Sequence, residues 1–454
     1  MKPRHIQSER ERSTAMYRQP AMGDYGSNGY HHHTNHQHSG GGQVAAGHRG
    51  RRGSRGRQRR DGSGSNSSGS RVCNYYGAQQ QEKEEERAPP PPPCTDFDVA
   101  YFHSYAHVGI HEEMIKDRAR TETYRNAILQ HQSNIAGKVV VDVGCGTGIL
   151  SIFCAQAGAK RVYAVDASDI AIQANEVIKA NNLSDTVIVL HGRVEDVEID
   201  EEVDVIISEW MGYMLLYESM LGSVIRARDR WLKPGGLILP SNATLYMAPV
   251  THPDRYSDSI DFWRNVYGID MSAMLPLAKQ CAFEEPSVET ISGENVLTWP
   301  HVVKNVDCYT VSVHELESIT TSFRFQSMMR GKLSPFHGFA FWFDVEFNGP
   351  DLNPSNNDTS SFNASSNGYV TDPNQRKKRP NPNEALVLST APEDPPTHWQ
   401  QTLIYFYDPI DVEQDQVIEG SVTLSQSKEN ARFMNIHLEY ASGGRSFVKE
   451  SVMR

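Results

Sequence analysis

Short apolar runs alternate with amphipathic stretches between residues 139 and 240, and turn residues separate them. Val139–Val143 is rich in β-branched residues and ends at a glycine, which predicts a buried strand. Ile149–Ala157 predicts a helix with Gly158 at its C-terminal cap. The alternation continues with strands expected at Val162–Val165, Val187–Leu190, Val203–Ser208 and Leu237–Leu239, and helices at Asp169–Asn181 and Tyr217–Arg230. Alternating strands and helices predict βαβ units around a mainly parallel sheet.

The pattern changes after Pro240, where the apolar runs become short, aromatic and rich in β-formers. These runs are Thr244–Met247, Phe339–Phe347, Ala385–Ser389 and Thr402–Tyr407. They predict an antiparallel barrel or sandwich. An Asn/Ser/Pro-rich insertion at about 350–383 carries the basic run Arg376–Arg379. We expect a disordered loop there, because structureless loops of this length are uncommon in compact domains.

Residues 1–95 have low sequence complexity, with the His-rich stretch His31–His38, an Arg/Gly block at Arg49–Arg60 and the proline run Pro89–Pro93. Few apolar residues are present to offset the entropy of ordering, so a disordered tail is predicted. The histidines have no fixed metal-ligand spacing, which favours a solvated tract over a metal site. The Arg/Gly block fits binding of RNA or anionic surfaces, nuclear import, or methylation of its own arginines.

Charge divides the chain in the same way. The formal net charge of −12 combines a tail with 15 basic and 8 acidic residues and a body, 96–454, with 29 basic and 48 acidic residues. A body of net charge −19 is a poor nucleic-acid partner and suits a cationic substrate, although solubility alone also explains it. Six cysteines without a Cys-x-x-Cys pair favour a reduced intracellular compartment. The lack of an apolar leader or 18-residue apolar run argues against secretion and membrane spanning.

A glycine-rich turn follows the first predicted strand of the α/β region. Gly144, Gly146 and Gly148 stand at alternate positions, and Ile149 occupies the place where a dinucleotide fingerprint requires glycine. Asp166 ends the second predicted strand, where its carboxylate could accept hydrogen bonds from ribose hydroxyls. The strand, glycines and acid together resemble the adenosylmethionine pocket of class I methyltransferases.

Two other positions fit a cofactor of this kind. Glu195 follows the third predicted strand and could accept from an adenine amino group, or it could be a solvated acid in an acidic run. His111–Thr121 predicts one amphipathic helix on which Arg120 could grip a carboxylate. The alternative is a surface helix with i,i+4 ion pairs, including an unfavourable Glu113–Asp117 pair.

Two glutamates mark the end of the fourth predicted strand. Glu209 and Glu218 flank an apolar and aromatic loop that contains no lysine or arginine. Two carboxylates in such a setting favour a planar cation, and an arginine side chain can offer each of them a bidentate edge. Paired carboxylates also catalyse glycoside hydrolysis, but that reaction needs no nucleoside pocket. A purely structural pair, one acid starting and one capping a helix, is the remaining alternative.

Four ordered motifs closely resemble the protein arginine N-methyltransferases, from about Asp98 to the C-terminus and excluding the insertion. The motifs are His111–Thr121, the Gly144-x-Gly-x-Gly turn, the Glu209/Glu218 loop and Thr397-His398-Trp399. The body resembles type I enzymes, and the stretches His337–Phe343, Leu386–Thr390 and Val412–Asp415 are most similar to subtype six.

The resemblance implies a class I (Rossmann-like) methyltransferase domain at 96–240 and an antiparallel β-barrel domain at 241–454, with a helical dimerisation arm at about 250–281. It implies that Glu209 and Glu218 are catalytic. Adenosylmethionine would be bound by His111, Arg120, Gly144, Asp166 and Glu195. The substrate pocket would include Tyr101, Tyr105, Met114, Asp117, Met220 and His398, with no metal. The family usually has glutamate at the position of Asp166, which predicts changed cofactor affinity.

The implied activity is transfer from S-adenosyl-L-methionine to histones and other Arg-rich proteins, forming monomethyl and asymmetric dimethyl arginine. The resemblance also implies a homodimer, a role in chromatin and transcription regulation, and a nuclear location with the cytoplasm as a second one. Two rival functions are a class I methyltransferase acting on RNA or a small molecule, and a catalytically silent adenosylmethionine-binding scaffold. The acidic body argues against the first, and the presence of both Glu209 and Glu218 argues against the second.

Overall fold

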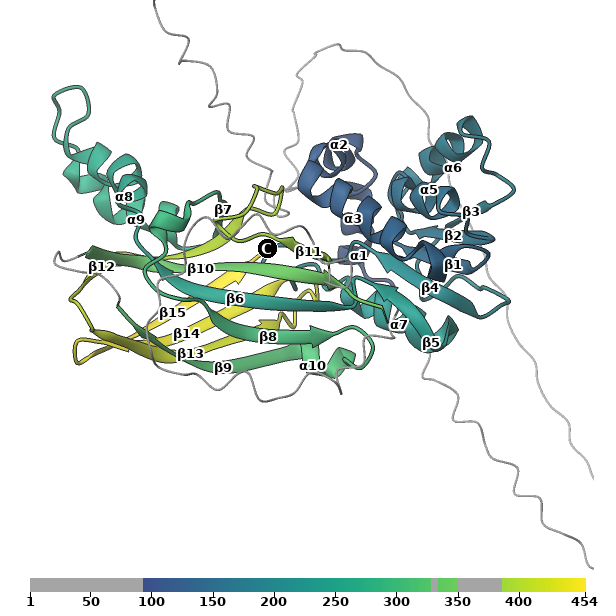
Figure 1. Ribbon diagram of the computed structural model, residues 1–454. Helices are drawn as coiled ribbons and strands as arrows, with labels where there is room; N and C mark the ends of the chain where they lie inside the picture. Colours follow the sequence, from purple (N-terminus) through teal and green to yellow (C-terminus); the bar gives the residue numbers. More distant parts are fainter. Residues whose placement is uncertain (1–92, 328–333, 350–385) are drawn as a thin grey trace, which may run out of the picture. The chain divides into compact units, whose positions relative to one another are not determined.

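The computed structural model describes residues 93–327, 334–349 and 386–454 (Figure 1). All of them belong to one compact unit that runs from Pro91 to Arg454. Residues 1–92, with the predicted histidine and Arg/Gly stretches, lie outside the described residues. So does the predicted insertion with its basic run Arg376–Arg379.

Four helices precede the first strand: α1 (Asp96–Ser104), α2 (Val108–Lys116), α3 (Arg118–Gln130) and α4 (Gln132–Ile135). The prediction of one helix through His111–Thr121 is wrong, because the backbone of Asp117 is extended at ψ 98°. The Asp117 carboxylate caps α3 by accepting from the Arg120 backbone N–H at 3.0 Å. The repulsion expected between Glu113 and Asp117 on one helix face is therefore also wrong, since Asp117 lies outside the helix.

The predicted parallel sheet is confirmed, with five strands in the order β3-β2-β1-β4-β5, all paired in parallel. Its elements are β1 (Val139–Val143), α5 (Ile149–Gln156), β2 (Arg161–Asp166), α6 (Ile170–Ala180), β3 (Val187–His191), β4 (Val203–Ser208), α7 (Leu221–Trp231) and β5 (Leu232–Leu239). Helix α5 packs against β1, β2 and β3, and α6 packs against β2 and β3. Helix α7 packs against β1, β4 and β5. This Rossmann-like core brings the carboxyl ends of its strands to one edge.

Asp142 is a fully buried acid in the centre of this sheet. Its Oδ2 accepts from the Ser151 hydroxyl at 2.6 Å, and its Oδ1 has no partner among the described residues. Burial raises the pKa of Asp142 from 3.8 to about 7. Between pH 3.8 and about pH 7 the folded protein therefore keeps a proton on Asp142 that the unfolded chain releases. This group makes the free energy of unfolding fall as pH rises through that range.

We predict that Asp142→Asn removes this pH dependence, which amounts to roughly 4 kcal/mol at most. Urea unfolding of both proteins at about pH 5 and about pH 8 measures it. The wild type should lose more stability than the variant between the two pH values. Equal losses in the two proteins would contradict the assignment.

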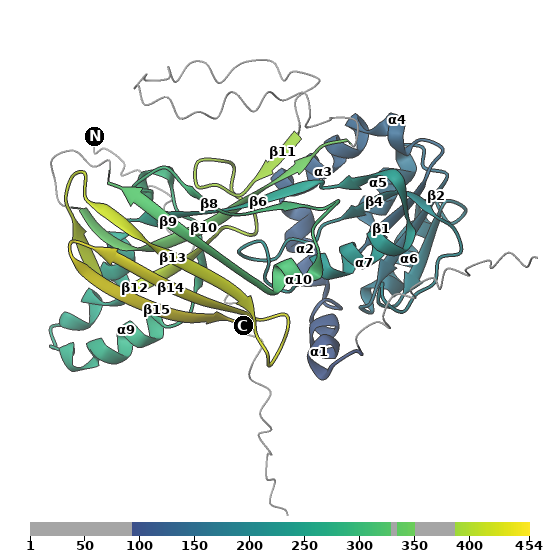
Figure 2. The ribbon, with the colours of Figure 1, turned by 90° about the horizontal axis from the view of Figure 1, so that it is seen from below.

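The segment after Pro240 forms two antiparallel sheets in a barrel-like arrangement, which confirms the predicted class (Figure 2). One sheet has the order β7-β12-β10-β6-β8 with β11 beside β10, and the other has the order β15-β14-β13-β9. The strands are β6 (Asn242–Val250), β7 (Ser287–Glu289), β8 (His301–Asp307), β9 (Ser318–Gln326), β10 (Ser334–Phe347), β11 (Leu386–Ser389), β12 (Gln401–Val412), β13 (Val417–Gln426), β14 (Met434–Ser442) and β15 (Arg445–Met453). Aromatic rings fill the space between the sheets, with Phe336 edge-on to Phe406 and Phe406 stacked on Tyr440.

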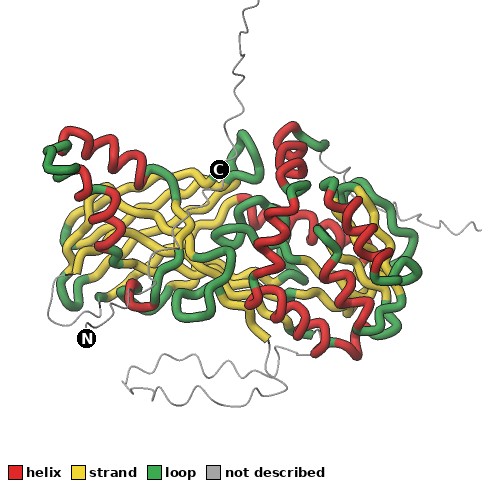
Figure 3. Tube along the Cα trace, turned by 90° about the horizontal axis from the view of Figure 1, so that it is seen from above, coloured by secondary structure: helices red, strands yellow, loops and turns green. Residues whose placement is uncertain are grey.

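A helical excursion connects β6 to β7 and overlaps the predicted arm (Figure 3). It contains α8 (Pro253–Ser259), η1 (Asp261–Arg264), η2 (Ser272–Met274) and α9 (Leu275–Phe283). Tyr256 stacks on Phe283 at its base, and Lys449 of β15 donates to the Phe283 carbonyl at 2.6 Å. Short elements η3 (Gly293–Asn295) and α10 (Val313–Glu317) complete the described chain, in which no helix is both long and apolar enough to cross a membrane.

Candidate active site

Three adjacent strands of the parallel sheet deliver residues to one edge. Strand β1 lies between β2 and β4, with Val143 opposite Val165 and Ser208. Gly144 follows β1, Asp166 ends β2 and Glu209 follows β4. The pairing of the strands therefore brings the predicted cofactor turn and the first predicted catalytic acid to the same end of the sheet, where α/β proteins bind ligands.

The glycine turn has a left-handed backbone at Gly144, Gly146 and Gly148, with φ of 72°, 54° and 82°. A Cβ atom added to Gly144 would lie 2.1 Å from the Met220 methyl, and one added to Gly146 would lie 3.0 Å from His111 Nδ1. The left-handed backbone favours glycine at both positions, and a larger residue would also displace the Met220 or His111 side chain. The turn is thus a bare backbone surface closed over by His111 and Met220, which fits the cofactor cradle that the sequence predicted.

Asp166 lies directly against this turn. Its Oδ2 accepts from the Gly146 N–H at 2.8 Å, and its Oδ1 accepts from the Ser168 N–H and hydroxyl at 2.8 and 2.6 Å. A carboxylate offers about four acceptor directions, so Asp166 retains capacity for a ribose hydroxyl. The Asp166 side chain, although shorter than the glutamate expected at this position, therefore both holds the turn and remains able to bind a nucleoside.

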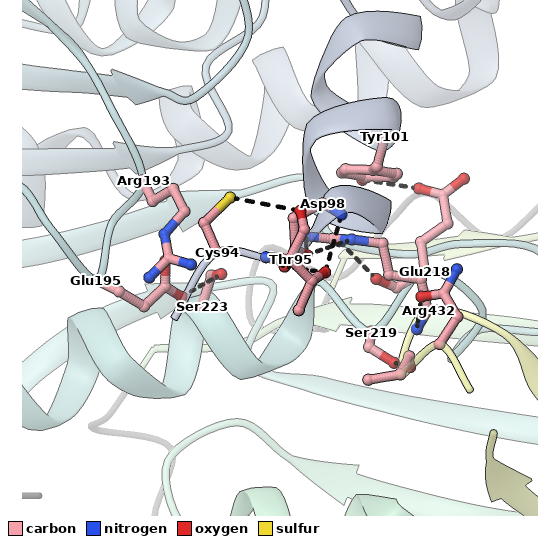
Figure 4. Close-up of polar contacts among 12 residues, drawn as sticks. Cys94, Thr95, Asp98, Tyr101, Arg193, Glu195, Glu218, Ser219, Ser223 and Arg432 are labelled. Carbon is pink, nitrogen blue, oxygen red and sulfur yellow. Dashed lines mark hydrogen bonds and ion pairs between the residues drawn. The ribbon is translucent and has the colours of Figure 1, made fainter. Parts of the chain in front are cut away.

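Glu195 follows β3 and is not a freely solvated acid, since its side chain is 17% exposed. Its Oε1 accepts from the Ser223 hydroxyl at 2.7 Å, and Arg193 Nε lies 3.8 Å from its Oε2 (Figure 4). The neighbouring Asp196 and Glu198 are 54% and 79% exposed. The structure therefore separates Glu195 from the surface acids beside it in sequence.

Glu209 is buried in an ion pair that the sequence analysis missed. Arg120 donates from Nε to Glu209 Oε2 at 3.0 Å, its Nη2 lies 3.0 Å from the same oxygen, and both side chains are less than 9% exposed. The loop itself contains no lysine or arginine, and the cation that pairs with Glu209 comes from α3, 89 positions earlier. The same guanidinium also donates to the Met114 carbonyl at 3.2 Å, which ties α2 to the site.

Glu218 is held from the opposite side by α1. Tyr101 and Tyr105 donate their hydroxyls to Glu218 Oε2 at 2.9 and 2.8 Å. Withdrawal from water raises the pKa of Glu218, while both hydroxyls and the Arg432 charge oppose that rise and the charge on Glu209 adds to it. Glu218 therefore holds a proton more readily than an ordinary glutamate does.

Each carboxylate keeps one oxygen for another partner. Arg120 engages Oε2 of Glu209, and the two tyrosines engage Oε2 of Glu218. Neither Oε1 atom has a hydrogen-bond partner among the described residues. The two ends of one loop therefore each carry a carboxylate with an unused acceptor oxygen, and a planar cation can bind carboxylates of this kind along its edges.

Asp117 and His398 form a pair beside this site. The Asp117 Oδ2 accepts from the His398 backbone N–H and lies 2.8 Å from His398 Nδ1. Burial opposes ionisation, but His398 and the Arg120 N–H lower the pKa of Asp117. The next residue, Trp399, donates to the Met211 carbonyl at 2.8 Å, so the Thr-His-Trp segment is fixed to the glutamate loop.

Sequence reasoning missed three polar partners of the site. Ser168 and Ser223 donate to the two predicted cofactor acids, and Arg432 reaches Glu218 from the C-terminal sheet. Arg432 lies 214 positions from Glu218, so no local pattern could have linked them. Across 93–327, 334–349 and 386–454, no cluster of three or more His, Cys, Asp or Glu side chains could hold a metal ion.

Comparison with known protein families gives a match for the parallel-sheet part of the chain and another for the part after Pro240. Residues 241–362 and 377–445 match the arginine methyltransferase oligomerization subdomain, and residues 126–241 match ribosomal protein L11 methyltransferase. The chain is 80% identical over 363 residues to probable protein arginine N-methyltransferase 6 of Arabidopsis thaliana, covering 80% of this chain and 83% of that protein. It is 44% identical over 350 residues to protein arginine N-methyltransferase 6 of Danio rerio, covering 76% and 90%.

Solved structures agree with these matches. The open conformation of Arabidopsis thaliana protein arginine methyltransferase 10 superposes with a TM-score of 0.65 at 34% identity, covering 78% of this chain and all of that one. The Trypanosoma brucei PRMT1 enzyme–prozyme heterotetramer with AdoHcy gives a TM-score of 0.64 at 33% identity, covering 77% of this chain and all of that one. The similarity therefore extends over most of the described residues.

Proposed function

The chain belongs to the protein arginine N-methyltransferase family, and from this premise we propose that it is a type I enzyme. Its cofactor is S-adenosyl-L-methionine. The proposed products are monomethyl and asymmetric dimethyl arginine. The observation that carries the proposal is the pair of Oε1 atoms that Glu209 and Glu218 leave without a partner in the described chain.

We propose that His111, Arg120, Gly144, Asp166 and Glu195 hold the cofactor. When bound, S-adenosyl-L-methionine supplies a methyl group on a positively charged sulfur. The bare backbone at Gly144 lets a ligand approach closely, and Asp166 and Glu195 provide acceptors for hydroxyl and amino groups. Arg120 pairs with Glu209, and we propose that the same guanidinium also attracts the cofactor's carboxylate.

The two glutamates activate the arginine substrate. A free guanidinium has a pKa near ~13.8 and a delocalised charge, so its nitrogens are poor nucleophiles. Carboxylate oxygens on two edges concentrate positive charge on the nitrogens they hold, which leaves more electron density on the remaining terminal nitrogen. Fixed orientation of that nitrogen supplies a further part of the rate enhancement.

The proton leaves the nitrogen as the new N–C bond forms, because the alkylated guanidinium nitrogen is then strongly acidic. We propose Glu218 as its acceptor, since burial raises the pKa of this carboxyl. We propose a positioning role for His398, whose ring Asp117 holds through Nδ1. This ring borders the substrate pocket and orients the arginine.

Type I specificity is supported by two methionines. The resemblance assigns Met114 and Met220 to the type I substrate pocket; Met220 packs over Gly144, and the Met114 carbonyl accepts from Arg120, which pairs with Glu209. Mass spectrometry of an unmodified histone-tail peptide after prolonged reaction tests the proposal. We expect monomethyl arginine followed by asymmetric dimethyl arginine. A product that stops at monomethyl or becomes symmetric would contradict type I.

We propose histones and other Arg-rich proteins as substrates, and chromatin and transcription as the setting. The net charge of −19 on residues 96–454 favours cationic tails by electrostatic steering. Nuclear location, with the cytoplasm as a second site, is proposed from the basic tail and Arg376–Arg379. Reporter fusions lacking both basic runs should leave the nucleus, and retention there would contradict the assignment.

We propose a homodimer built by the helical excursion at residues 253–283. This arm exposes Phe262, Tyr267, Ile269 and Leu277, which are between 51% and 100% exposed. Helix α6 exposes Ile172 and Val177, a second apolar face that suits the arm of a partner subunit. Because each protomer carries both surfaces, the arm of each can pack on α6 of the other, which gives a symmetric dimer.

Ile269→Asp is expected to give a monomer, because a charge at the apolar tip would be desolvated in the interface. Light scattering after size exclusion measures the mass. Val448→Asp is the matched control, because Val448 is 64% exposed on β15 and Ile269 is 61% exposed. A dimeric Ile269→Asp protein, or a monomeric wild type, would contradict the proposed arm.

A further inference from the structure

The turn between β13 and β14 lies against the glutamate loop, although it is more than 200 residues away in sequence. Ser219 donates its hydroxyl to the Ala431 carbonyl at 2.6 Å and accepts from Gln426 at 3.0 Å. The backbone N–H of Glu218 donates to the Arg432 carbonyl at 3.0 Å. The C-terminal sheet is therefore bonded directly to the residue that carries the second carboxylate.

Arg432 connects three parts of the site with one side chain (Figure 4). One terminal nitrogen donates to the Glu218 carbonyl at 2.9 Å. Its Nε and other terminal nitrogen donate to Asp98 Oδ1 of α1 at 3.0 and 2.7 Å. The guanidinium carbon lies 3.8 Å from the centre of the Tyr101 ring, within the range of a cation–π contact.

The loop that Arg432 grips has a strained backbone. Met214, Leu215, Glu218 and Ser219 have positive φ between 53° and 75°. A left-handed conformation costs a non-glycine residue roughly 1–2 kcal/mol, and it persists only where the surroundings enforce it. The bonds from the C-terminal sheet are the surroundings that hold Glu218 and Ser219.

We propose that Arg432 is a positioning residue for the arginine-binding carboxylate, so that the C-terminal sheet completes the active site. It fixes the backbone of Glu218 through its own backbone and side chain, and it fixes α1 through Asp98. Tyr101 is thereby set to donate to Glu218 Oε2, which leaves Oε1 toward the substrate. This inference rests on the proposed function of Glu218.

The side chain must be arginine to make all of these contacts. A lysine could pair with Asp98 or donate to the Glu218 carbonyl, but it lacks the planar fork that reaches both while lying on Tyr101. Arg432→Lys therefore keeps the charge and loses the geometry. Arg432→Gln loses both.

Three measurements test the proposal in the full-length protein. Arg432→Gln should lower kcat by about 10²-fold, and Arg432→Lys should recover less than a tenth of the wild-type value. Without cofactor or substrate, hydrogen exchange of the Glu218 amide should speed up in both variants. The double variant Asp98→Asn/Arg432→Gln should be no slower than Arg432→Gln alone, because both substitutions break one unit.

The pH profile separates positioning from mere folding. The charged and titratable groups that face Glu218 are Tyr101 of α1, Tyr105 at the C-cap of α1, Glu209, Tyr213 and Tyr217 of the same loop, and Arg432. Loss of the Arg432 charge removes an interaction that lowers the pKa of Glu218. The acidic limb of the kcat profile should therefore move to higher pH in Arg432→Gln, and much less in Arg432→Lys.

Arg445→Gln is the matched control, because Arg445 is an exposed arginine at the start of β15. It should leave kcat, exchange and the pH profile unchanged. Full activity in Arg432→Lys, unchanged exchange at Glu218 or additive effects with Asp98→Asn would each overturn the proposal. A wild type that forms another methylarginine product would refute the type I assignment while leaving these comparisons valid.

Discussion

Glu209→Gln is expected to lower kcat by about 10³-fold or more, while the Kd for S-adenosyl-L-methionine changes by less than about three-fold. The substitution removes the charge that Arg120 and the substrate guanidinium share, so the pair of carboxylates can no longer polarise the substrate. The glutamine keeps an amide oxygen that can accept from Arg120 Nε, and Asp166 still holds the glycine turn through the Gly146 N–H, so the residues proposed to bind the cofactor keep their places.

Isothermal titration with the cofactor and steady-state transfer to a histone-tail peptide measure the two quantities. Glu176→Gln is the control, because Glu176 is an exposed glutamate on α6 that pairs with Lys179. It should leave both quantities unchanged. Substantial transfer by Glu209→Gln would remove this residue from the catalytic pair.

Gly144→Val is expected to weaken cofactor binding by at least about 10²-fold, or to abolish it. The residue has φ 72°, which a β-branched side chain adopts only with strain, and its Cβ would lie 2.1 Å from the Met220 methyl. Met220 would have to leave its place over the turn. The added methyl groups would also fill the backbone surface that a ligand approaches.

Gly137→Val provides a matched control for the strain. Gly137 has φ 74° but has nothing within 4 Å of an added Cβ, and it lies before β1. Both variants should lose thermal stability, and only Gly144→Val should lose binding in isothermal titration. Equal cofactor affinity in the two variants would contradict the location of the cradle.

The local pattern of apolar and polar residues was sufficient to predict the parallel sheet. The predicted limits of β1 and β4 agree with the structure to the residue, because both strands are short runs rich in Val and Ile, each interrupted by one aspartate, whose ends are marked by glycine or polar residues. Helix α7 begins at Leu221 rather than Tyr217, since Glu218 and Ser219 are held in a left-handed conformation by Ala431 and Arg432. That boundary is set by tertiary contacts, which periodicity does not record.

The candidate site was predictable where its residues follow strands. Strands β1, β2 and β4 are neighbours in the sheet, which brings together the residues at their carboxyl ends, Gly144, Asp166 and Glu209. The apolar run before each of these residues predicted its strand. The partners of these residues were not predictable in the same way. Arg120 lies in the first turn of α3, directly after the break at Asp117, and the local pattern there predicted a continuous amphipathic helix.

The central claim is that Glu209 and Glu218 direct methyl transfer to arginine nitrogen, and one assay tests it most directly. Wild type and Glu209→Gln are incubated with methyl-labelled S-adenosyl-L-methionine, histones and RNA, and the labelled products are hydrolysed and separated. We predict label in monomethyl and asymmetric dimethyl arginine with the wild type, and none with the variant. Cofactor binding without labelled arginine, or label on RNA instead, would contradict the account.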